Sequence, residues 1–315
     1  MSIDIEKLYT DIKNGNENKI AKAITMVEDG TKNAIKLMEK VYKNVDPSYM
    51  IGISGPPGSG KSTLTQRIVQ LWLKKDIKVG IIAIDPTSHF SGGALLGDRI
   101  RMNEIATDSG VFIRSMATRG SMGGLNSSIY DTVLLFSLAG YEYIIIETVG
   151  VGQNEIDIVK LADTTIFVTV PEAGDEIQAY KAGLMEVGDI FVVNKSDRPN
   201  SQQMVLTLEQ LVSFKEGKDI WEPPVLSTNA LKNEGVSDIN KWINKHHTYL
   251  KDNNLLQESR KNVIKAQMIN LMEKRLHEKY IKPILNDKKF GKYIDLIYKK
   301  QEDPYSVIKK LLSVD

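Results

Sequence analysis

Hydrophobic and polar positions follow two different periodicities along the chain, and the changes between them predict three parts. Near the amino terminus apolar side chains recur at three- and four-residue spacing, as in Ile20, Ile24 and Val27, which predicts amphipathic helices. The same spacing returns near the carboxyl terminus, where Ile264 and Met268 begin a second apolar stripe. We therefore expect a helical N-terminal extension, a central α/β domain and a helical C-terminal extension, with the bounds 1–46, 47–250 and 251–315.

The central part contains short apolar runs that are typical of buried β-strands. Seven runs predict strands, at residues 50–54, 78–84, 111–115, 143–147, 164–170, 189–193 and 224–227. Several are almost continuously apolar, as expected for strands that are buried on both faces of a parallel sheet. Because helical stretches separate them, we expect right-handed crossovers and an α/β fold with a doubly wound, mostly parallel sheet. Ligands of such sheets bind at the carboxyl ends of the strands.

The composition is that of an ordinary globular protein, and it excludes several kinds of chemistry. The 315 residues are 42% hydrophobic and 26% charged, and the net charge is +1. This balance creates no bulk field toward nucleic acid or an anionic membrane, so neither is an expected partner. The chain has no cysteine, which excludes disulfides, thiolate catalysis and Cys-ligated zinc. No apolar run approaches the length of a membrane span, and the first ten residues lack the pattern of a signal peptide, so we expect a cytoplasmic protein.

The segment after the first predicted strand reads GPPGSGKS, at residues 55–62, and a helical pattern follows it. Strand, glycine-rich loop and helix in this order predict a P-loop, whose backbone N–H groups surround the phosphates of a nucleoside triphosphate. Lys61 would reach the β- and γ-phosphate oxygens, Ser62 would bind Mg²⁺, and the helix N-terminus would add its dipole. The residues expected to contact the phosphates are Gly55, Pro57, Gly58, Ser59, Gly60, Lys61, Ser62 and Thr63.

A second motif, NKSD at residues 194–197, indicates which base is bound. The Asp197 carboxylate can accept hydrogen bonds from the ring N–H and the exocyclic amine of guanine, a donor pair that adenine lacks. Asn194 can reach back to the P-loop, and the stem of Lys195 can lie along the base. The motif therefore predicts GTP and GDP as ligands rather than ATP. The loop after the last predicted strand offers a backbone N–H to the guanine O6, or it is a plain strand-to-helix connection; its residues are Asn229, Ala230 and Leu231.

Acidic residues extend the predicted site toward a metal ion and hydrolysis. Glu147 ends a strand where most P-loop proteins place an aspartate that holds Mg²⁺ through water, and Gly150 follows where a glycine bonds the γ-phosphate. Gln153 could orient the attacking water. Asp85 and Asp98 flank a glycine-rich segment able to close over the γ-phosphate, although Asp98 can also cap the helix that follows. We expect Ser62, Asp85, Asp98 and Glu147 at the metal, and Lys61, Asp85, Asp98, Glu147 and Gln153 in catalysis.

Together these residues resemble one family, the MeaB/ArgK-type accessory GTPases of methylmalonyl-CoA mutase. The resemblance rests on GPPGSGKST (55–63), IDPTSHFSGGALLGDRIRM (84–102), RSMATRGSMGGL (114–125), ETVGVGQNEIDI (147–158), PEAGDEIQAYKAGLMEVGDIFVVNKSD (171–197) and DPYS (303–306). It covers nearly the whole chain, and the blocks at 84–102 and 147–158 are specific to the family. Two departures are Asn229, where a small serine is usual in the guanine loop, and Phe90 in the first switch.

The resemblance implies a partner and an assembly. In this family the G domain gates the loading of adenosylcobalamin into a B12-dependent acyl-CoA mutase on a separate chain and protects that enzyme, and the C-terminal helices form a homodimer. The third switch, at 171–189, would face the mutase through Asp175, Glu176, Gln178 and Lys181. Because the sequence offers no obvious arginine finger or well-placed glutamine, we expect slow intrinsic hydrolysis that a partner accelerates.

Two other functions compete with this interpretation. An ATP-dependent kinase or ATPase linked to lysine, arginine and ornithine transport has been attached to the same family, but Asp197 argues against ATP, and no kinase H-R-D or D-F-G set is present. A metallochaperone GTPase would need ligands for a soft metal, which a chain without cysteine hardly offers. His246, His247 and His277 lie in helical sections without partners that the sequence identifies.

Overall fold

The computed structural model describes six stretches of the chain, and these divide between two compact units. The described residues are 3–85, 102–117, 127–148, 161–173, 188–213 and 221–312. The first unit is Met1–Val263 and the second is Ile264–Asp315.

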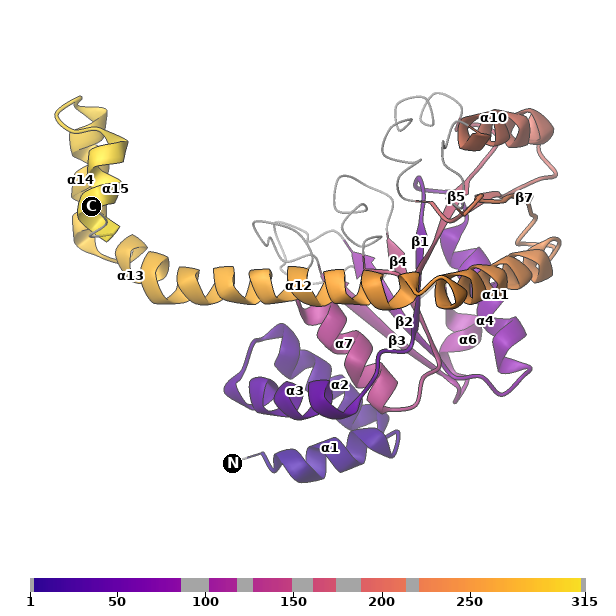
Figure 1. Cartoon of the computed structure of the whole chain (residues 1–315), viewed down its shortest axis with the longest axis horizontal. Coiled ribbons are helices and arrows are strands. Elements are labelled where there is room, and N and C mark those ends of the chain that lie inside the picture. The colour runs from indigo at the N-terminus through magenta and orange to yellow at the C-terminus, as the bar shows by residue number, and fades with distance from the viewer. Residues whose placement is uncertain are drawn as a thin grey trace. The chain divides into compact units, whose positions relative to one another are not determined.

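The first unit is built around one seven-stranded parallel sheet (Figure 1). Its strands are β1 (Tyr49–Ser54), β2 (Val79–Asp85), β3 (Val111–Ala117), β4 (Tyr143–Thr148), β5 (Thr164–Thr169), β6 (Ile190–Val193) and β7 (Val225–Ser227). Their order across the sheet is β3-β2-β4-β1-β5-β6-β7. The central strand β1 pairs with β4 on one side and β5 on the other, so the direction of winding reverses there. The α/β class and the doubly wound parallel sheet that the sequence predicts are confirmed.

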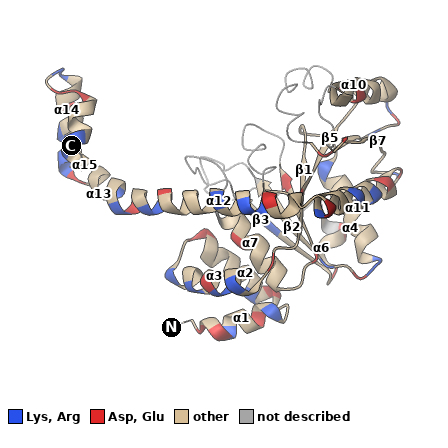
Figure 2. Cartoon of the chain, viewed as in Figure 1, with Lys and Arg blue, Asp and Glu red and all other residues tan. Residues whose placement is uncertain are grey.

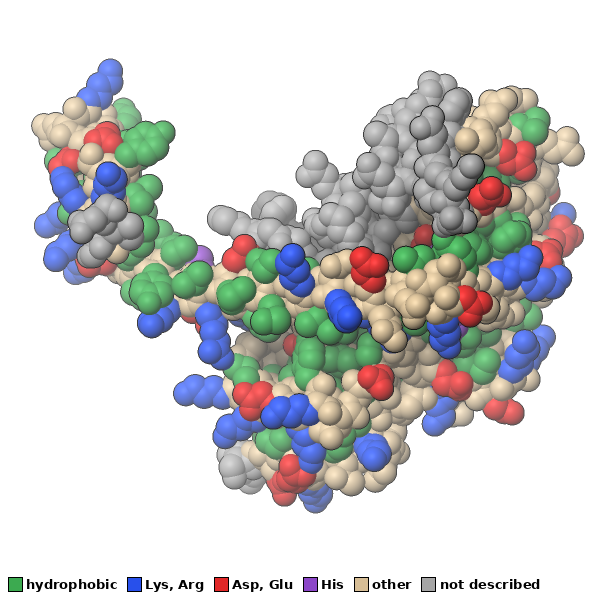
Figure 3. Space-filling view, in the orientation of Figure 1, with side chains coloured by type: hydrophobic (Ala, Val, Ile, Leu, Met, Phe, Trp, Pro, Cys, Tyr) green, Lys and Arg blue, Asp and Glu red, His purple; other side chains and the backbone are tan. Residues whose placement is uncertain are grey.

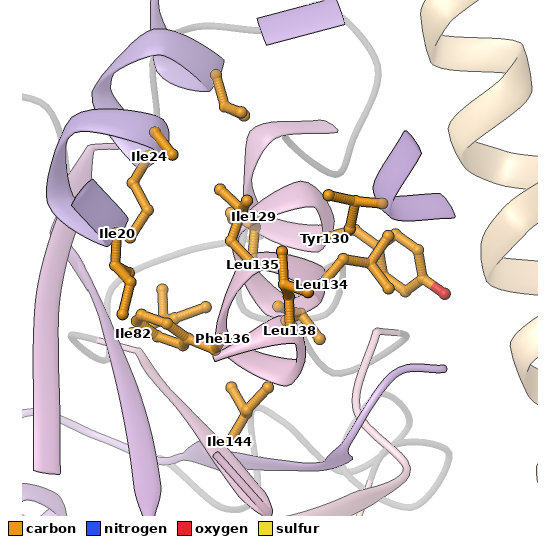
Figure 4. Close-up of a cluster of buried hydrophobic side chains, with 14 of the residues drawn as sticks. Ile20, Ile24, Ile82, Ile129, Tyr130, Leu134, Leu135, Phe136, Leu138 and Ile144 are labelled. Carbon is orange, nitrogen blue, oxygen red and sulfur yellow. The ribbon is translucent and has the colours of Figure 1, made fainter. Parts of the chain in front are cut away.

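One face of the sheet is covered by α1 (Ile5–Lys13), α2 (Glu17–Glu28), α3 (Lys32–Asn44) and α7 (Ser127–Leu138). The apolar stripes of these helices pack onto side chains that alternate strands send to this face, among them Ile82, Ile144 and Ile146. Figure 4 shows Ile20 and Ile24 of α2 facing the side chains of α7 and the sheet. The predicted helical extension therefore packs onto the sheet and shares its core.

The three N-terminal helices begin and end where the sequence signals it. Asn16 caps α2 by accepting from Lys19 N, and Thr31 caps α3 by accepting from Ala34 N. The glycine before each cap, Gly15 or Gly30, has a positive φ that ends the preceding helix. Each side-chain cap is worth about 1 kcal/mol, so these short turns specify the helix boundaries.

The opposite face is covered by α4 (Lys61–Leu73), α6 (Asn103–Ala106) and α11 (Val236–Asp252), while α10 (Ser201–Ser213) packs beside β6 and β7. The core under α4 and α11 contains Ile51, Ile53 and Ile145, which point away from the first core. Because β1 and β4 are apolar on both faces, they lie fully inside the unit. The loop at residues 55–60 connects β1 to α4 and forms part of the candidate site.

The helix α12 (Leu255–Leu276) begins in the first unit and continues into the second. The second unit then contains a π-helical turn, η1 (His277–Ile281), followed by α13 (Lys282–Leu285), α14 (Lys288–Tyr298) and α15 (Pro304–Leu312). Large apolar side chains on these helices are exposed, among them Met268, Leu271, Met272, Leu276, Ile294 and Tyr305, and Figure 3 shows hydrophobic side chains gathered along α12. Basic side chains recur between them (Figure 2). Within the described residues, no helix combines the length and the hydropathy that a membrane crossing requires.

Candidate functional site

The candidate site lies at the carboxyl ends of the central strands, beside the point where the winding of the sheet reverses. The loop after β1 begins at Gly55, and Glu147 lies near the end of β4. Asn194 follows β6, and Thr228 follows β7. Because all the strands are parallel, these four positions share one edge of the sheet, which is where open α/β sheets bind ligands.

The loop between β1 and α4 requires glycine at two positions. Gly55 has a φ of +140°, and a Cβ there would overlap the carbonyl oxygen of Val168 on β5. Gly60 has a φ of +90°, and a Cβ there would overlap the Asn194 side-chain amide. Gly60 also precedes α4 without any side-chain cap, so N–H groups of the first helical turn remain available to an anion. The backbone geometry is that of a phosphate-binding loop.

Two polar side chains of this loop are buried. The Lys61 ammonium donates to the carbonyl oxygens of Gly55 at 2.6 Å and Pro56 at 3.0 Å, and its side chain is 6% exposed. The Ser59 hydroxyl is fully buried and has no hydrogen-bond partner among the described residues. A buried polar group of this kind is usually satisfied, and a phosphate oxygen is one group that could do so. The loop therefore fits a phosphate ligand.

Glu147 is held by two hydroxyl groups of α4. Ser62 Oγ donates to its Oε1 at 2.6 Å, and Thr65 Oγ1 donates to its Oε2 at 2.8 Å. The carboxylate is buried, so these bonds fix its position next to the start of the helix. Hard oxygen groups such as these suit Mg²⁺, which in proteins commonly takes one or two side-chain ligands and fills its other positions with phosphate and water oxygens. No cluster of three or more potential His, Asp or Glu metal ligands occurs in the described parts of the chain.

Asn194 joins the P-loop to the loop after β7. Its Nδ2 donates to Ser59 O at 2.8 Å, and its Oδ1 accepts from Ala230 N at 3.1 Å and from Thr228 Oγ1 at 3.4 Å. The side chain is 3% exposed, so these bonds are shielded from water. The contact to the P-loop that the sequence predicts for Asn194 is present, and one side chain thereby fixes two loops relative to each other.

The rest of the NKSD segment turns outward toward solvent. Lys195 has a left-handed φ of +57°, and its ammonium donates to Gly58 O at 2.7 Å. Ser196 N donates to Thr228 O, which binds this segment to the loop after β7. Asp197, the last residue of the segment, is exposed. Its carboxylate is therefore accessible to the edge of a bound base.

Several predicted residues cannot be placed. Asp85 ends β2, but its side chain lies outside the description. Asp98, Gly150 and Gln153 lie outside the described residues, as do Phe90 and the mutase-facing residues predicted at 175–181. The structure brings together the predicted residues Lys61, Ser62, Glu147, Asn194, Lys195, Asn229 and Ala230. Two further polar residues on α4, Thr65 and Arg67, contact the site and were not singled out from the sequence.

Comparisons with known proteins agree with this geometry. The family model described as methylmalonyl-CoA mutase-associated GTPase MeaB matches residues 20–283. A protein of Pyrococcus horikoshii named as a GTPase is 42% identical over 306 residues, which cover 96% of this chain and 95% of that one. GTPase ArgK of Escherichia coli is 31% identical over 290 residues, which cover 90% of this chain and 86% of the relative. A crystal structure of a LAO/AO transport system kinase matches with a TM-score of 0.73 and 25% identity, and the match covers 99% of this chain and 98% of the other.

The fold, the glycine-dependent phosphate loop and the NKSD segment are those of a P-loop GTPase that binds guanine nucleotides. The family model spans both the sheet and the loops that form the site. The chain therefore belongs to the MeaB family of methylmalonyl-CoA mutase-associated GTPases.

Proposed function

We propose that this GTPase uses its nucleotide state to gate the loading of adenosylcobalamin into a B12-dependent acyl-CoA mutase, most simply methylmalonyl-CoA mutase, and to protect that enzyme. The structural observation that supports a nucleotide-dependent role is the bridge from Asn194 to Ser59 and Ala230, which joins the phosphate loop to the loop after β7. The family description supports the choice of partner.

In this proposal the phosphates of GTP or GDP lie in the loop at residues 55–63. Lys61 exchanges its bonds to the loop carbonyls for bonds to the β- and γ-phosphate oxygens, and the Ser59 hydroxyl and the first N–H groups of α4 complete the cradle. Asp197 accepts from the guanine edge, and Lys195 supports the base from its position on Gly58. The loop at residues 229–231 faces the guanine O6.

Mg²⁺ would be held at the start of α4. Ser62 supplies a hydroxyl ligand, and Glu147, with Asp85 and Asp98, supplies carboxylates in direct or water-mediated contact. Bound Mg²⁺ supplies charge neutralisation between the phosphates. Lys61 stabilises the charge that develops on the phosphate oxygens, Gly150 donates to the γ-phosphate, and Gln153 orients the attacking water. Intrinsic hydrolysis is slow, and the partner enzyme accelerates it.

The C-terminal helices would form a homodimer. Their exposed apolar side chains, such as Met268, Met272 and Leu276, each more than half exposed, are of the kind that a partner surface covers. Lys274 and Arg275 lie among them in the last turn of α12. We propose no nucleic-acid or membrane partner, because the net charge of +1 creates no attraction for either.

The test is the rate of GTP hydrolysis by the purified protein, alone and with B12-dependent mutase from the same organism. We expect the mutase to raise the rate and to co-purify with the GTPase when a non-hydrolysable GTP analogue is present. An unchanged rate together with no complex would refute the proposal.

A transport-linked kinase is the alternative, because the matched crystal structure carries that name. It requires ATP and a phosphoacceptor. Competition between ATP and GTP for the site, in the wild type and in Asp197→Asn, separates the two functions. A guanine-specific site loses its preference for GTP in the variant, whereas a kinase site prefers ATP in both proteins.

A further inference from the structure

One side chain of the P-loop helix reaches the loop after β7. Arg67 lies in the second turn of α4, and its Nε donates to Ala230 O at 3.1 Å while its Nη2 lies 3.4 Å from Leu231 O. Its Nη1 donates to Gln70 Oε1 at 3.0 Å on the same helix. Arg67 is partly buried, and its bond to Ala230 O is better shielded from water than the exposed contact to Leu231 O. Arg67 therefore joins the helix that starts the phosphate site to the loop that faces the base.

Hydrogen bonds fix both the backbone N–H and the carbonyl of Ala230. Its N–H donates to Asn194 Oδ1 at 3.1 Å, and its carbonyl accepts from Arg67 and also from Asn233 N at 3.3 Å. Its side chain is 1% exposed and lies in the core. The orientation of the peptide that links Ala230 to Leu231 is consequently fixed.

The orientation of this peptide decides where its N–H points. A trans peptide is planar, so the Leu231 N–H points opposite to the Ala230 carbonyl that Arg67 holds. Asn229 N donates to Glu234 O, and Ala230 N donates to Asn194. The Leu231 N–H has no acceptor among the described residues. Of the three N–H groups at 229–231, it is the one left for a ligand.

We infer that Arg67 is a specificity-determining positioning residue, which directs the Leu231 N–H toward the O6 atom of guanine without contacting the nucleotide. The inference rests on the proposed guanine site. A hydrogen bond from a cation to a carbonyl is stronger than a neutral one, and it polarises the peptide so that its N–H becomes a better donor. Adenine carries an amine instead of O6, so the Leu231 N–H would find no hydrogen-bond acceptor at that position.

The test compares nucleoside diphosphates whose bases differ only in the groups on the edge that the protein binds. We would measure the affinity of GDP, of inosine diphosphate, which keeps O6, and of 2-aminopurine riboside diphosphate, which lacks it. Arg67→Met should weaken GDP and inosine diphosphate by the same factor, about tenfold, and leave the affinity of the 2-aminopurine nucleotide unchanged. Arg67→Lys should behave in the same way, because one ammonium does not reproduce the fork that reaches both carbonyls.

Gln70→Ala is the matched control, because it removes only the partner of Nη1 and should leave all three affinities unchanged. Equal weakening of all three nucleotides by both Arg67 variants would overturn the inference, since a loop that is merely destabilised does not discriminate at O6. Unchanged affinities would overturn it as well. If the wild-type protein did not prefer GDP to ADP, the proposed guanine site itself would fail, which is a different result.

Discussion

Replacing Asn194 with alanine tests whether one buried amide joins the two halves of the nucleotide site. The substitution removes the donor to Ser59 O and the acceptor of Ala230 N, and both partners lie in residues that are at most 1% exposed. A buried polar group that loses its partner costs about 1–3 kcal/mol, so the two together cost about 2–6 kcal/mol of folding free energy. The bond to Thr228 is long and adds little.

This loss should appear before any nucleotide is added. For a unit of this size it lowers Tm by roughly 10 °C, which thermal unfolding followed by circular dichroism measures directly. The affinity for GDP should also fall, because the phosphate loop and the base loop no longer hold each other. Asn194→Asp keeps an acceptor for Ala230 N but places a carboxylate oxygen against the Ser59 carbonyl oxygen in a buried position, so it should destabilise the protein at least as much as Asn194→Ala. A variant Asn194→Ala with wild-type Tm and wild-type GDP affinity would refute the reasoning.

Three further substitutions test other parts of the structure. Gly60→Ala should abolish detectable GDP binding, because the new Cβ would overlap the Asn194 amide and the residue has a left-handed φ. Titration with a fluorescent GDP analogue measures the affinity, and wild-type affinity in the variant would contradict the loop geometry. Arg260→Met should lower the free energy of unfolding, measured by chemical denaturation, by about 3 kcal/mol, because it leaves the buried Asp163 carboxylate without its cation. Burial raises the pKa of this carboxyl, and the arginine opposes that shift. Adding Asp163→Asn removes the unpaired charge and should recover part of the loss, and no recovery would show that the unpaired charge is not the cause. Burial and nearby cations lower the pKa of His247 to about 4, so the folded protein keeps this ring neutral while the unfolded chain protonates it near pH 6.5. The free energy of unfolding should therefore fall as the pH drops from 6.5 to 4, by about 1 kcal/mol after solvent screening at this half-buried position. Denaturation curves recorded across this pH range should show a smaller fall for His247→Gln.

The sequence predicts the sheet well because its signals are local. All seven predicted strands occur, and their ends lie within two residues of those predicted. Runs such as Ile144–Ile146 are apolar on both faces, so they are stable only as strands in the interior of the sheet. The P-loop and the NKSD segment can also be recognised from the sequence. Each consists of neighbouring residues, and the chemistry of phosphate or guanine binding determines the residue types and their spacing.

Contacts between distant segments that belong to no recognisable motif do not follow from the sequence. Arg67 reads as one more polar residue on an amphipathic helix, and only the packing of α4 beside the loop after β7 brings it to Ala230. The sequence identifies no partner for His246, yet the side chain is buried with Nδ1 2.7 Å from Thr164 Oγ1 and Nε2 3.6 Å from Asp189 Oδ1. Such pairs depend on which strand ends lie side by side, and the local pattern does not encode that.

The central claim is that the nucleotide state of this GTPase controls cofactor loading of its partner enzyme. The direct measurement is the rate at which adenosylcobalamin enters the B12-dependent apo-mutase, followed by its absorption spectrum, in the presence of the GTPase with GTP, with a non-hydrolysable GTP analogue or with GDP. The account predicts that loading depends on which nucleotide is bound and that Asn194→Ala weakens this dependence. Loading at the same rate with every nucleotide, and at the same rate without the GTPase, would contradict it.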